Sequence, residues 1–169
     1  LTGLTPDTLM WDDEAQDKIK QMNLYVCDNL IQTVNAVYES ALKLKESIGL
    51  DLVVIDYLQL LKTEGKHQTR EQEISEITRQ LKLMARELDV PVLALSQLSR
   101  DSEKRGGRPK LSDLRGSGSI EQDADVVFLI HKGTSTELIL AKQRDGATGI
   151  IEVDFQKELS RFTEKGELD

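Results

Sequence analysis

The chain has 169 residues, of which 38% are hydrophobic and 31% are charged, and this balance favours a single globular domain over a disordered or membrane-spanning chain. Its formal net charge of −8 argues against a free-standing module that holds nucleic acid by general electrostatics, because such modules carry a basic face. No apolar run is long enough for a bilayer and no basic-then-apolar signal opens the chain, so we expect a cytoplasmic protein without membrane association.

Cysteine and histidine are too rare to build a disulfide or a metal cluster. Cys27 is the only cysteine, and His67 and His131 are far apart in the sequence, which leaves no metal-ligand spacing. The chain opens with Leu1 rather than methionine, and "LTGLTPDTL" resembles the middle of a domain more than its start. We therefore expect residues 1–169 to form a single partial domain of a longer protein.

Two helices are predicted in the first third of the chain. A weak acidic helix is expected over residues 12–22. A second is expected over 34–48, where apolar residues recur every three or four positions between the candidate N-cap Thr33 and the stop at Gly49. Short β-rich runs lie between and after the helices, at 24–27, 52–56, 91–96, 126–130, 137–142 and 150–155.

The strongest helical signal follows Thr69, which forms a capping-box pattern with Gln72. The residues after it place apolar side chains on one stripe. That stripe consists of Ile74, Ile77, Leu81, Met84 and Leu88. Further along, the glycine pair, the proline and the mixed charges of "RDSEKRGGRPK" (100–110) predict a long mobile loop.

The order of strands and helices predicts an α/β fold. Strand, helix, strand, helix, strand is the signature of right-handed crossovers, and hence of a mostly parallel sheet flanked by helices. The last two β-rich runs are joined by "QRDGATG", whose Asp-Gly pair is typical of a hairpin turn. An antiparallel hairpin is therefore expected at the C-terminal edge of the sheet.

Polar residues follow three of the β-rich runs, at the strand ends where open parallel sheets bind ligands. Asp56 ends the first run, Gln97 follows the second, and Lys142 and Arg144 end the first strand of the hairpin. A carboxylate suits Mg²⁺, an amide suits a γ-phosphate, and an arginine suits the charge that develops in phosphoryl transfer. From these residues alone a simpler interpretation also stands, in which they are an exposed strand end, a loop amide and a solvated hairpin.

The segment 97–115 is locally basic, with six basic residues against three acidic ones. A solvated loop has this composition, and so does a loop that lines a channel for DNA.

Four motifs together resemble one family. "VVIDYLQLL", "EISEITRQLKLMARELDVPVLALSQLSR", "LSDLRGSGSIEQDADVVFLI" and "LAKQRDGATG", in this order and spacing, are similar to the C-terminal, RecA-like ATPase domain of bacterial replicative DNA helicases, the DnaB family. The resemblance implies ATP and Mg²⁺ as cofactors. It also implies that Asp56 is the Walker B aspartate that holds the magnesium, that Gln97 senses the γ-phosphate, and that Lys142 and Arg144 reach the nucleotide of a neighbouring subunit.

The resemblance also implies partners. Arg115, Gly116 and Gly118 match the loop that lines the central channel of a hexamer and holds single-stranded DNA by its phosphates. Copies of a locally basic loop converging in a ring would let an acidic protein bind DNA. A primase and a helicase loader are further expected partners.

Three departures from the family pattern matter. The phosphate-binding loop GxxxxGK[ST] and the catalytic glutamate do not occur in the 169 residues, and both are expected upstream of Leu1. Gly116 stands where the family pattern usually has glutamate, and "HKGTSTE" is shorter than its family counterpart. We therefore expect the isolated chain to be inactive.

Two kinds of function remain open at the level of the sequence. The first is part of an ATP-hydrolysing motor that moves along single-stranded DNA and unwinds duplex during replication. The second is a non-catalytic assembly or binding module. Another RecA-type ATPase is a third alternative, which the DNA-loop sequence disfavours.

Overall fold

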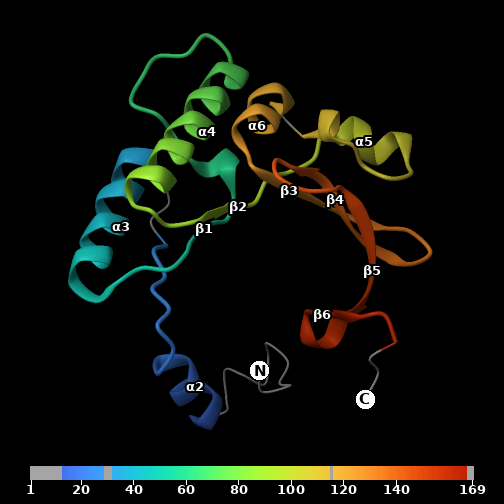
Figure 1. The fold of residues 1–169 in the computed structure, drawn as a ribbon, viewed down its shortest axis with the longest axis horizontal. Helices are drawn as coiled ribbons and strands as arrows, with labels where there is room; N and C mark the ends of the chain where they lie inside the picture. Colours follow the sequence, from blue (N-terminus) through green and yellow to red (C-terminus); the bar gives the residue numbers. More distant parts are fainter. Residues whose placement is uncertain (1–12, 29–31, 115, 167–169) are drawn as a thin grey trace.

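The computed structural model describes residues 13–28, 32–114 and 116–166 (Figure 1). The α-helices of these ranges are α2 (Asp13–Lys20), α3 (Val34–Ile48), α4 (Arg70–Glu87), α5 (Arg100–Arg105) and α6 (Ser117–Asp123). Short 3-10 helices are η1 (Leu58–Leu60), η2 (Leu111–Asp113) and η3 (Lys157–Leu159). The strands are β1 (Val53–Ile55), β2 (Val92–Ala94), β3 (Val126–Lys132), β4 (Thr136–Gln143), β5 (Gly149–Gln156) and β6 (Arg161–Glu164). No helix in these ranges has both the length and the apolar character to cross a bilayer.

The first two predicted helices are confirmed, as α2 and α3. Thr33 caps α3, because its hydroxyl oxygen accepts a hydrogen bond from the Ala36 N–H at 3.2 Å. Gly49 ends the helix with a φ of 89° and donates its N–H to the Lys45 carbonyl.

The third predicted helix is α4, and its apolar stripe forms the centre of the core. Thr69 accepts from the Gln72 N–H at 3.2 Å, as a cap should, and the Gln72 side chain accepts from the Gln68 N–H. Ile77 is fully buried and Ile74 is 1% exposed. α4 packs against α3, α6, β2 and η1, so this helix joins the two halves of the described chain.

The parallel part of the fold consists of β1 and β2, with Val54 opposite Leu93 and Ile55 opposite Ala94. Ile55 belongs to the core with α3 and α4. Val54 and Leu93 share the other face and are 56% and 53% exposed. Helices therefore cover one face of this pair and leave an apolar face open.

The α/β class is confirmed, but the sheet is divided differently from the prediction. The run 126–130 was expected to continue the parallel sheet and instead forms β3 of a separate antiparallel sheet, in the order β3-β4-β5-β6. In the described residues the antiparallel sheet is thus the larger one. The expected hairpin is confirmed as β4 and β5.

Two other predictions are wrong. Residues 24–27 form no strand, and Val26 is 81% exposed, because no strand of the described chain pairs with this segment. The expected loop 100–110 begins with α5, where Ser102 donates both its N–H and its hydroxyl to the Ser99 carbonyl. Ion pairs between this segment and more distant residues hold it further.

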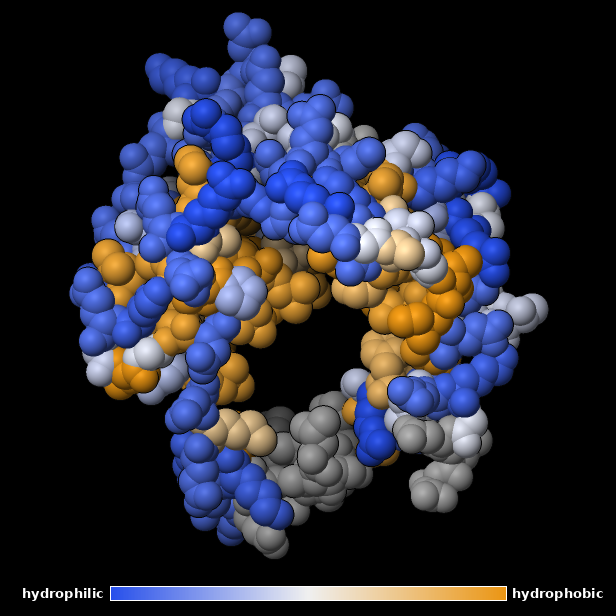
Figure 2. Space-filling model, viewed as in Figure 1, coloured by the Kyte–Doolittle hydropathy of each residue, from blue (hydrophilic) through white to orange (hydrophobic). Residues whose placement is uncertain are grey.

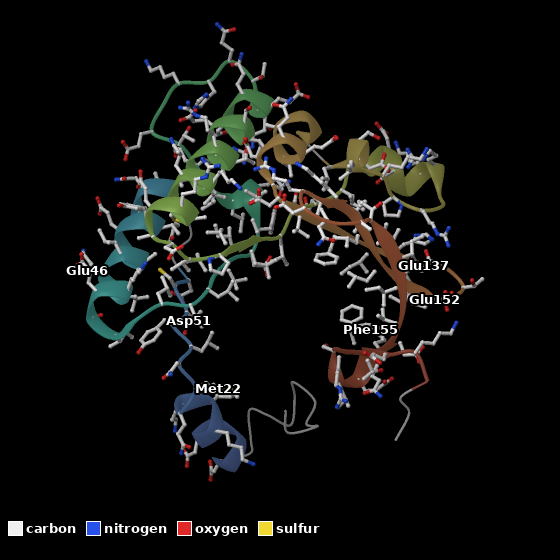
Figure 3. The ribbon with its side chains drawn as sticks, viewed as in Figure 1. Met22, Glu46, Asp51, Glu137, Glu152 and Phe155 are labelled. Atoms are coloured by element: carbon white, nitrogen blue, oxygen red, sulfur yellow. The ribbon has the colours of Figure 1, made fainter. Side chains whose placement is uncertain are left out.

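The two sheets form an arch around a hollow lined with apolar side chains (Figures 1 and 2). On the antiparallel sheet, Phe128 and Ile130 lie opposite Leu140 and Leu138 and are 51% and 56% exposed. Figure 3 shows Phe155 on the inner side of this sheet, and Glu137 and Glu152 on the outer side. Each sheet therefore turns an uncovered apolar face to the hollow.

Candidate functional site

Asp56 stands directly after β1, on the carboxyl end of the strand. Its side chain is exposed, and no residue within the described ranges forms a hydrogen bond or ion pair with it. The carboxylate is therefore available to a ligand. Because the carboxylate is exposed and not buried in the core, it does not carry the free-energy cost of an unpaired buried charge.

Gln97 lies at the same edge of the parallel pair, just after β2. The register that pairs Ile55 with Ala94 brings the two strand ends level, and the Leu95 N–H continues the ladder to the Ile55 carbonyl at 2.9 Å. Gln97 is exposed. The structure thus brings Asp56 and Gln97 to one sheet edge, as parallel pairing requires.

Gln59, which sequence reasoning missed, bridges the two strand ends. Its amide nitrogen donates to the Ser96 hydroxyl at 3.0 Å, and its carbonyl oxygen accepts from the Gln97 N–H at 3.4 Å. Arg70 in turn donates to the Gln59 backbone carbonyl at 2.7 Å. The signal in the sequence is only that Gln59 follows Asp56 by three residues, which does not reveal a contact with residues 96–97.

Lys142 and Arg144 lie on a different part of the chain, at the end of β4 and just beyond it. The Lys142 ammonium donates to the carbonyls of Glu121 and Ala124, the latter at 2.7 Å. The Arg144 guanidinium forms an ion pair with Asp125 at 3.0 Å. Within the described chain, no hydrogen bond or ion pair joins either residue to the strand ends at Asp56 and Gln97.

Asp125, next to Lys142 and Arg144, forms ion pairs with two basic side chains. Lys82 of α4 forms an ion pair with one carboxylate oxygen, and Arg144 forms one with the other. The hydrogen bond from Lys82, aided by the positive charges of Lys82, Arg144 and Lys142, holds the pKa of Asp125 below its ordinary value. The carboxylate is therefore ionised at neutral pH.

The basic segment is partly neutralised by ion pairs that the sequence did not predict. Arg105 binds Asp113 through two nitrogens, at 2.9 and 2.5 Å, and Arg108 binds Glu137 of β4 at 2.7 and 2.8 Å. The Arg105 hydrogen bond, supported by the Lys110 N–H, lowers the pKa of Asp113. The Arg108 pair fastens the segment to the outer side of the antiparallel sheet, and the Arg105 pair joins two residues within the segment.

The residues expected to meet DNA are described only in part. Arg115 lies outside the described residues. Gly116 precedes α6 in the left-handed conformation, with φ 85° and ψ 30°, and a Cβ at this position would lie 3.0 Å from Ile74 Cγ2. Gly118 lies within α6 and a Cβ there would meet nothing within 4 Å. The backbone conformation and the close contact thus favour glycine at position 116, and neither favours it at 118.

The described residues contain no group of three or more histidine, cysteine, aspartate or glutamate side chains that would hold a metal ion. A single exposed carboxylate such as Asp56 suits Mg²⁺, which keeps most of its own waters and takes few protein ligands. The chain's own contribution to a magnesium site therefore fits that ion and does not fit a metal held by a protein cage.

Known proteins resemble this chain in sequence. A family model described as "DnaB-like helicase C terminal domain" matches residues 5–164. The chain is 44% identical to the replicative DNA helicase DnaB of Leifsonia xyli, over 95% of this chain and 38% of that protein. It is 42% identical to the replicative DNA helicase DnaB of Geobacillus stearothermophilus, over 94% of this chain and again 38% of that protein. The chain therefore spans well under half the length of these relatives.

Solved structures resemble it in fold. One is a DnaB-like replicative helicase described with its interactions with primase, with a TM-score of 0.83 and 41% identity over 89% of this chain and 40% of that chain. Another is described as an ATPase domain, with the same TM-score and identity over 89% of this chain and 58% of that chain. These neighbours agree with the RecA-like ATPase fold that the motifs predicted. The chain belongs to the family of DnaB-like helicase C-terminal domains.

Proposed function

We propose that this chain is part of the ATP-driven motor of a hexameric replicative DNA helicase, which moves along single-stranded DNA and separates the duplex. The observation that carries the proposal is the edge of the parallel pair, where an exposed carboxylate and an exposed amide stand on neighbouring strand ends. Family membership supports it, since the relatives are named replicative DNA helicases.

In this proposal the strand-end residues act on ATP. Asp56 holds the water shell of Mg²⁺, which would supply charge neutralisation at the phosphates. Gln97 hydrogen-bonds to the γ-phosphate. The Gln59 side chain accepts from the Gln97 N–H and so holds the backbone of residue 97 in place. The chain's own residues thus orient a nucleotide at this edge.

Lys142 and Arg144 serve the nucleotide of the neighbouring subunit. Support comes from their attachment to residues 121–125, at the end of α6 and just before β3, rather than to the strand ends that hold Asp56 and Gln97. A cation supplied from a neighbour neutralises charge as the γ-phosphate transfers, an effect of about 10³ to 10⁵ in rate in known cases.

The open apolar faces support the proposal that further segments complete the domain. Val54, Leu93, Phe128 and Ile130 are each about half-exposed, and monomeric proteins rarely leave such a continuous apolar lining uncovered. We assign the phosphate-binding loop and the catalytic glutamate to such a segment. The full-length subunit that contains this chain is called the intact helicase below.

The proposed partners follow from the family. Arg115, Gly116 and Gly118 meet the phosphates of single-stranded DNA in the channel, with Gly118 in the first turn of α6 rather than in a loop, and the subunits assemble as a hexamer. A solved relative is described with its interactions with primase, and a primase and a helicase loader are the partners proposed for the intact helicase.

The test uses the intact helicase with Asp56→Asn, a nearly isosteric change that removes the charge which orients magnesium. ATPase activity should fall to background while the ring stays assembled by size-exclusion chromatography. Asp51→Asn is the matched control, because Asp51 is an exposed aspartate shortly before the same strand (Figure 3). If Asp56→Asn hydrolyses ATP at the parental rate, the magnesium assignment is wrong and the non-catalytic module or another RecA-type ATPase becomes the better account.

A further inference from the structure

Asp125 lies beside Arg144, the arginine proposed to act on the neighbouring subunit's nucleotide. The helicase proposal gives Asp125 no role. Resting on that proposed function, we propose that Asp125 is a positioning residue: its carboxylate and its backbone carbonyl hold Arg144 in the orientation in which it enters the neighbouring subunit's nucleotide site.

Arg144 is attached to Asp125 at two points. Its backbone N–H donates to the Asp125 carbonyl at 2.9 Å, and its guanidinium Nη1 lies 3.0 Å from Asp125 Oδ1. The neighbouring register, with Val126 opposite Gln143, continues this contact into the β3–β4 ladder. Because Arg144 itself lies in the turn after β4, these two bonds are what tie it to the sheet.

The ion pair with Asp125 uses only part of the hydrogen-bonding capacity of the Arg144 guanidinium. A guanidinium has five N–H donors in a fixed plane, and Asp125 engages one nitrogen of Arg144 while the side chain remains 48% exposed. Among the described residues no other side chain pairs with the guanidinium, so its remaining donors can bind a second anion. Asp125 can therefore orient Arg144 during contact with a phosphate, without release of the pair first.

The Asp125 carboxylate is itself fixed. Its second oxygen is bound by Lys82 from α4, and Lys142 holds the adjoining carbonyls of Glu121 and Ala124. α4 and α6 pack together in the core. The aspartate is thus a rigid support rather than a mobile surface group, and rigid support is what a positioned catalytic cation needs.

The inference is tested in the intact helicase with Asp125→Asn, which keeps the shape of the side chain and removes its charge. We expect kcat for ATP to fall about 10- to 100-fold, because a misplaced catalytic group loses rate to that degree. The KM for ATP should change less than about twofold, since Arg144 is proposed to act on charge that develops in the transition state rather than on ATP in the ground state.

Two controls separate positioning from loss of an ion pair. Lys82→Ala removes the other partner of Asp125 and leaves the Arg144 contact, and Glu152→Gln breaks the exposed pair with Lys165 elsewhere on the same sheet. Glu152→Gln should keep kcat within about twofold of the parent. Lys82→Ala loosens the support of Asp125 but leaves its carboxylate on Arg144, so it should lower kcat less than Asp125→Asn does. A fall in kcat with Lys82→Ala as large as with Asp125→Asn would overturn the inference, because the role would then be structural.

Mixed rings add a readout that a folding defect does not give. Asp125→Asn subunits mixed with Asp56→Asn subunits should regain activity, because the latter supply an intact Arg144 and Asp125 to sites with an intact Asp56. Mixed with Arg144→Ala subunits they should gain none. If Arg144→Ala is rescued by Asp56→Asn but Asp125→Asn is not, the inference fails and the proposed function stands; if neither is rescued, the proposed shared site fails.

Discussion

Replacing Gly116 by alanine should destabilise the fold, and the structure gives the size of the effect. The residue has φ 85° and ψ 30°, and an L-residue loses about 1–2 kcal/mol in the left-handed region. The new Cβ would also lie 3.0 Å from Ile74 Cγ2 and 3.3 Å from Ile74 Cβ. Ile74 is 1% exposed, so it has little room to move, and overpacking of a core adds about 1 kcal/mol at its lower end.

The two contributions together give a loss of about 2–3 kcal/mol in the free energy of unfolding. For a chain of this size, each 1 kcal/mol lowers Tm by about 2–4 °C, so Tm should fall by about 4–12 °C. Gly118→Ala is the matched control two residues away, because its Cβ would meet nothing within 4 Å. Within a helix that change should raise stability by up to about 1 kcal/mol.

The assay is equilibrium urea unfolding followed by far-UV circular dichroism, with thermal melts as a second measure, on the parent and both variants. The expected result is a lower midpoint for Gly116→Ala and an equal or higher one for Gly118→Ala. Equal midpoints for Gly116→Ala and the parent would refute the left-handed conformation and the contact with Ile74. Glutamate, which the family pattern has at this position, should be at least as unfavourable as alanine for the same backbone reason.

Three further predictions address the ion pairs, the caps and the nucleotide. Because Arg105 lowers the pKa of Asp113 below its ordinary 3.8, the pair's stability is present above that value and is lost as pH falls through the lowered pKa. As pH drops from about 4 to about 2, the urea midpoint of Arg105→Gln should therefore fall less than that of the parent. The same pH profile for both proteins would contradict this. Thr69→Ala should destabilise by about 0.5–2 kcal/mol through loss of the α4 cap, whereas a change within error in the same urea assay would show that the cap is unimportant. The isolated chain, which lacks GxxxxGK[ST], should not bind Mg-ATP at micromolar concentrations by calorimetry, and clear binding would be the opposing result.

Helices α3 and α4 could be predicted because their signals are local, whereas the short helices α5 and α6 were not predicted. The stripe from Ile74 to Leu88 has the helical period, and Thr33, Gly49 and Thr69 mark ends by hydrogen bonds within a few residues of themselves. The hairpin was predictable for the same reason, since its turn lies between its two strands.

Strand partners and long-range ion pairs could not be predicted. An apolar run such as 126–130 shows that a strand exists and does not show which strand it pairs with or in which direction. The two-point pair of Arg108 with Glu137 joins residues 29 positions apart, and no local pattern reveals it. The segment 100–110 therefore has the composition of a mobile loop while such contacts fasten it.

The site residues show the same contrast between local sequence signals and contacts that form only on folding. Strand ends identified Asp56 and Gln97, and parallel pairing brought them to one edge. Gln59 and Asp125 were missed, because each matters through contacts that only the folded chain creates. The assignments of Lys142 and Arg144 stay predictions, since the neighbouring subunit on which they would act lies outside this chain.

The central claim, a nucleotide site shared between subunits, is tested most directly by the ATPase activity of mixed rings of the intact helicase. Subunits with Asp56→Asn and subunits with Arg144→Ala are each expected to be inactive alone. Mixed, with subunit exchange confirmed, they should regain activity that is greatest at intermediate ratios, because some interfaces then pair an intact Asp56 with an intact Arg144 from the neighbour. No recovery at any mixing ratio would contradict a finger supplied between subunits.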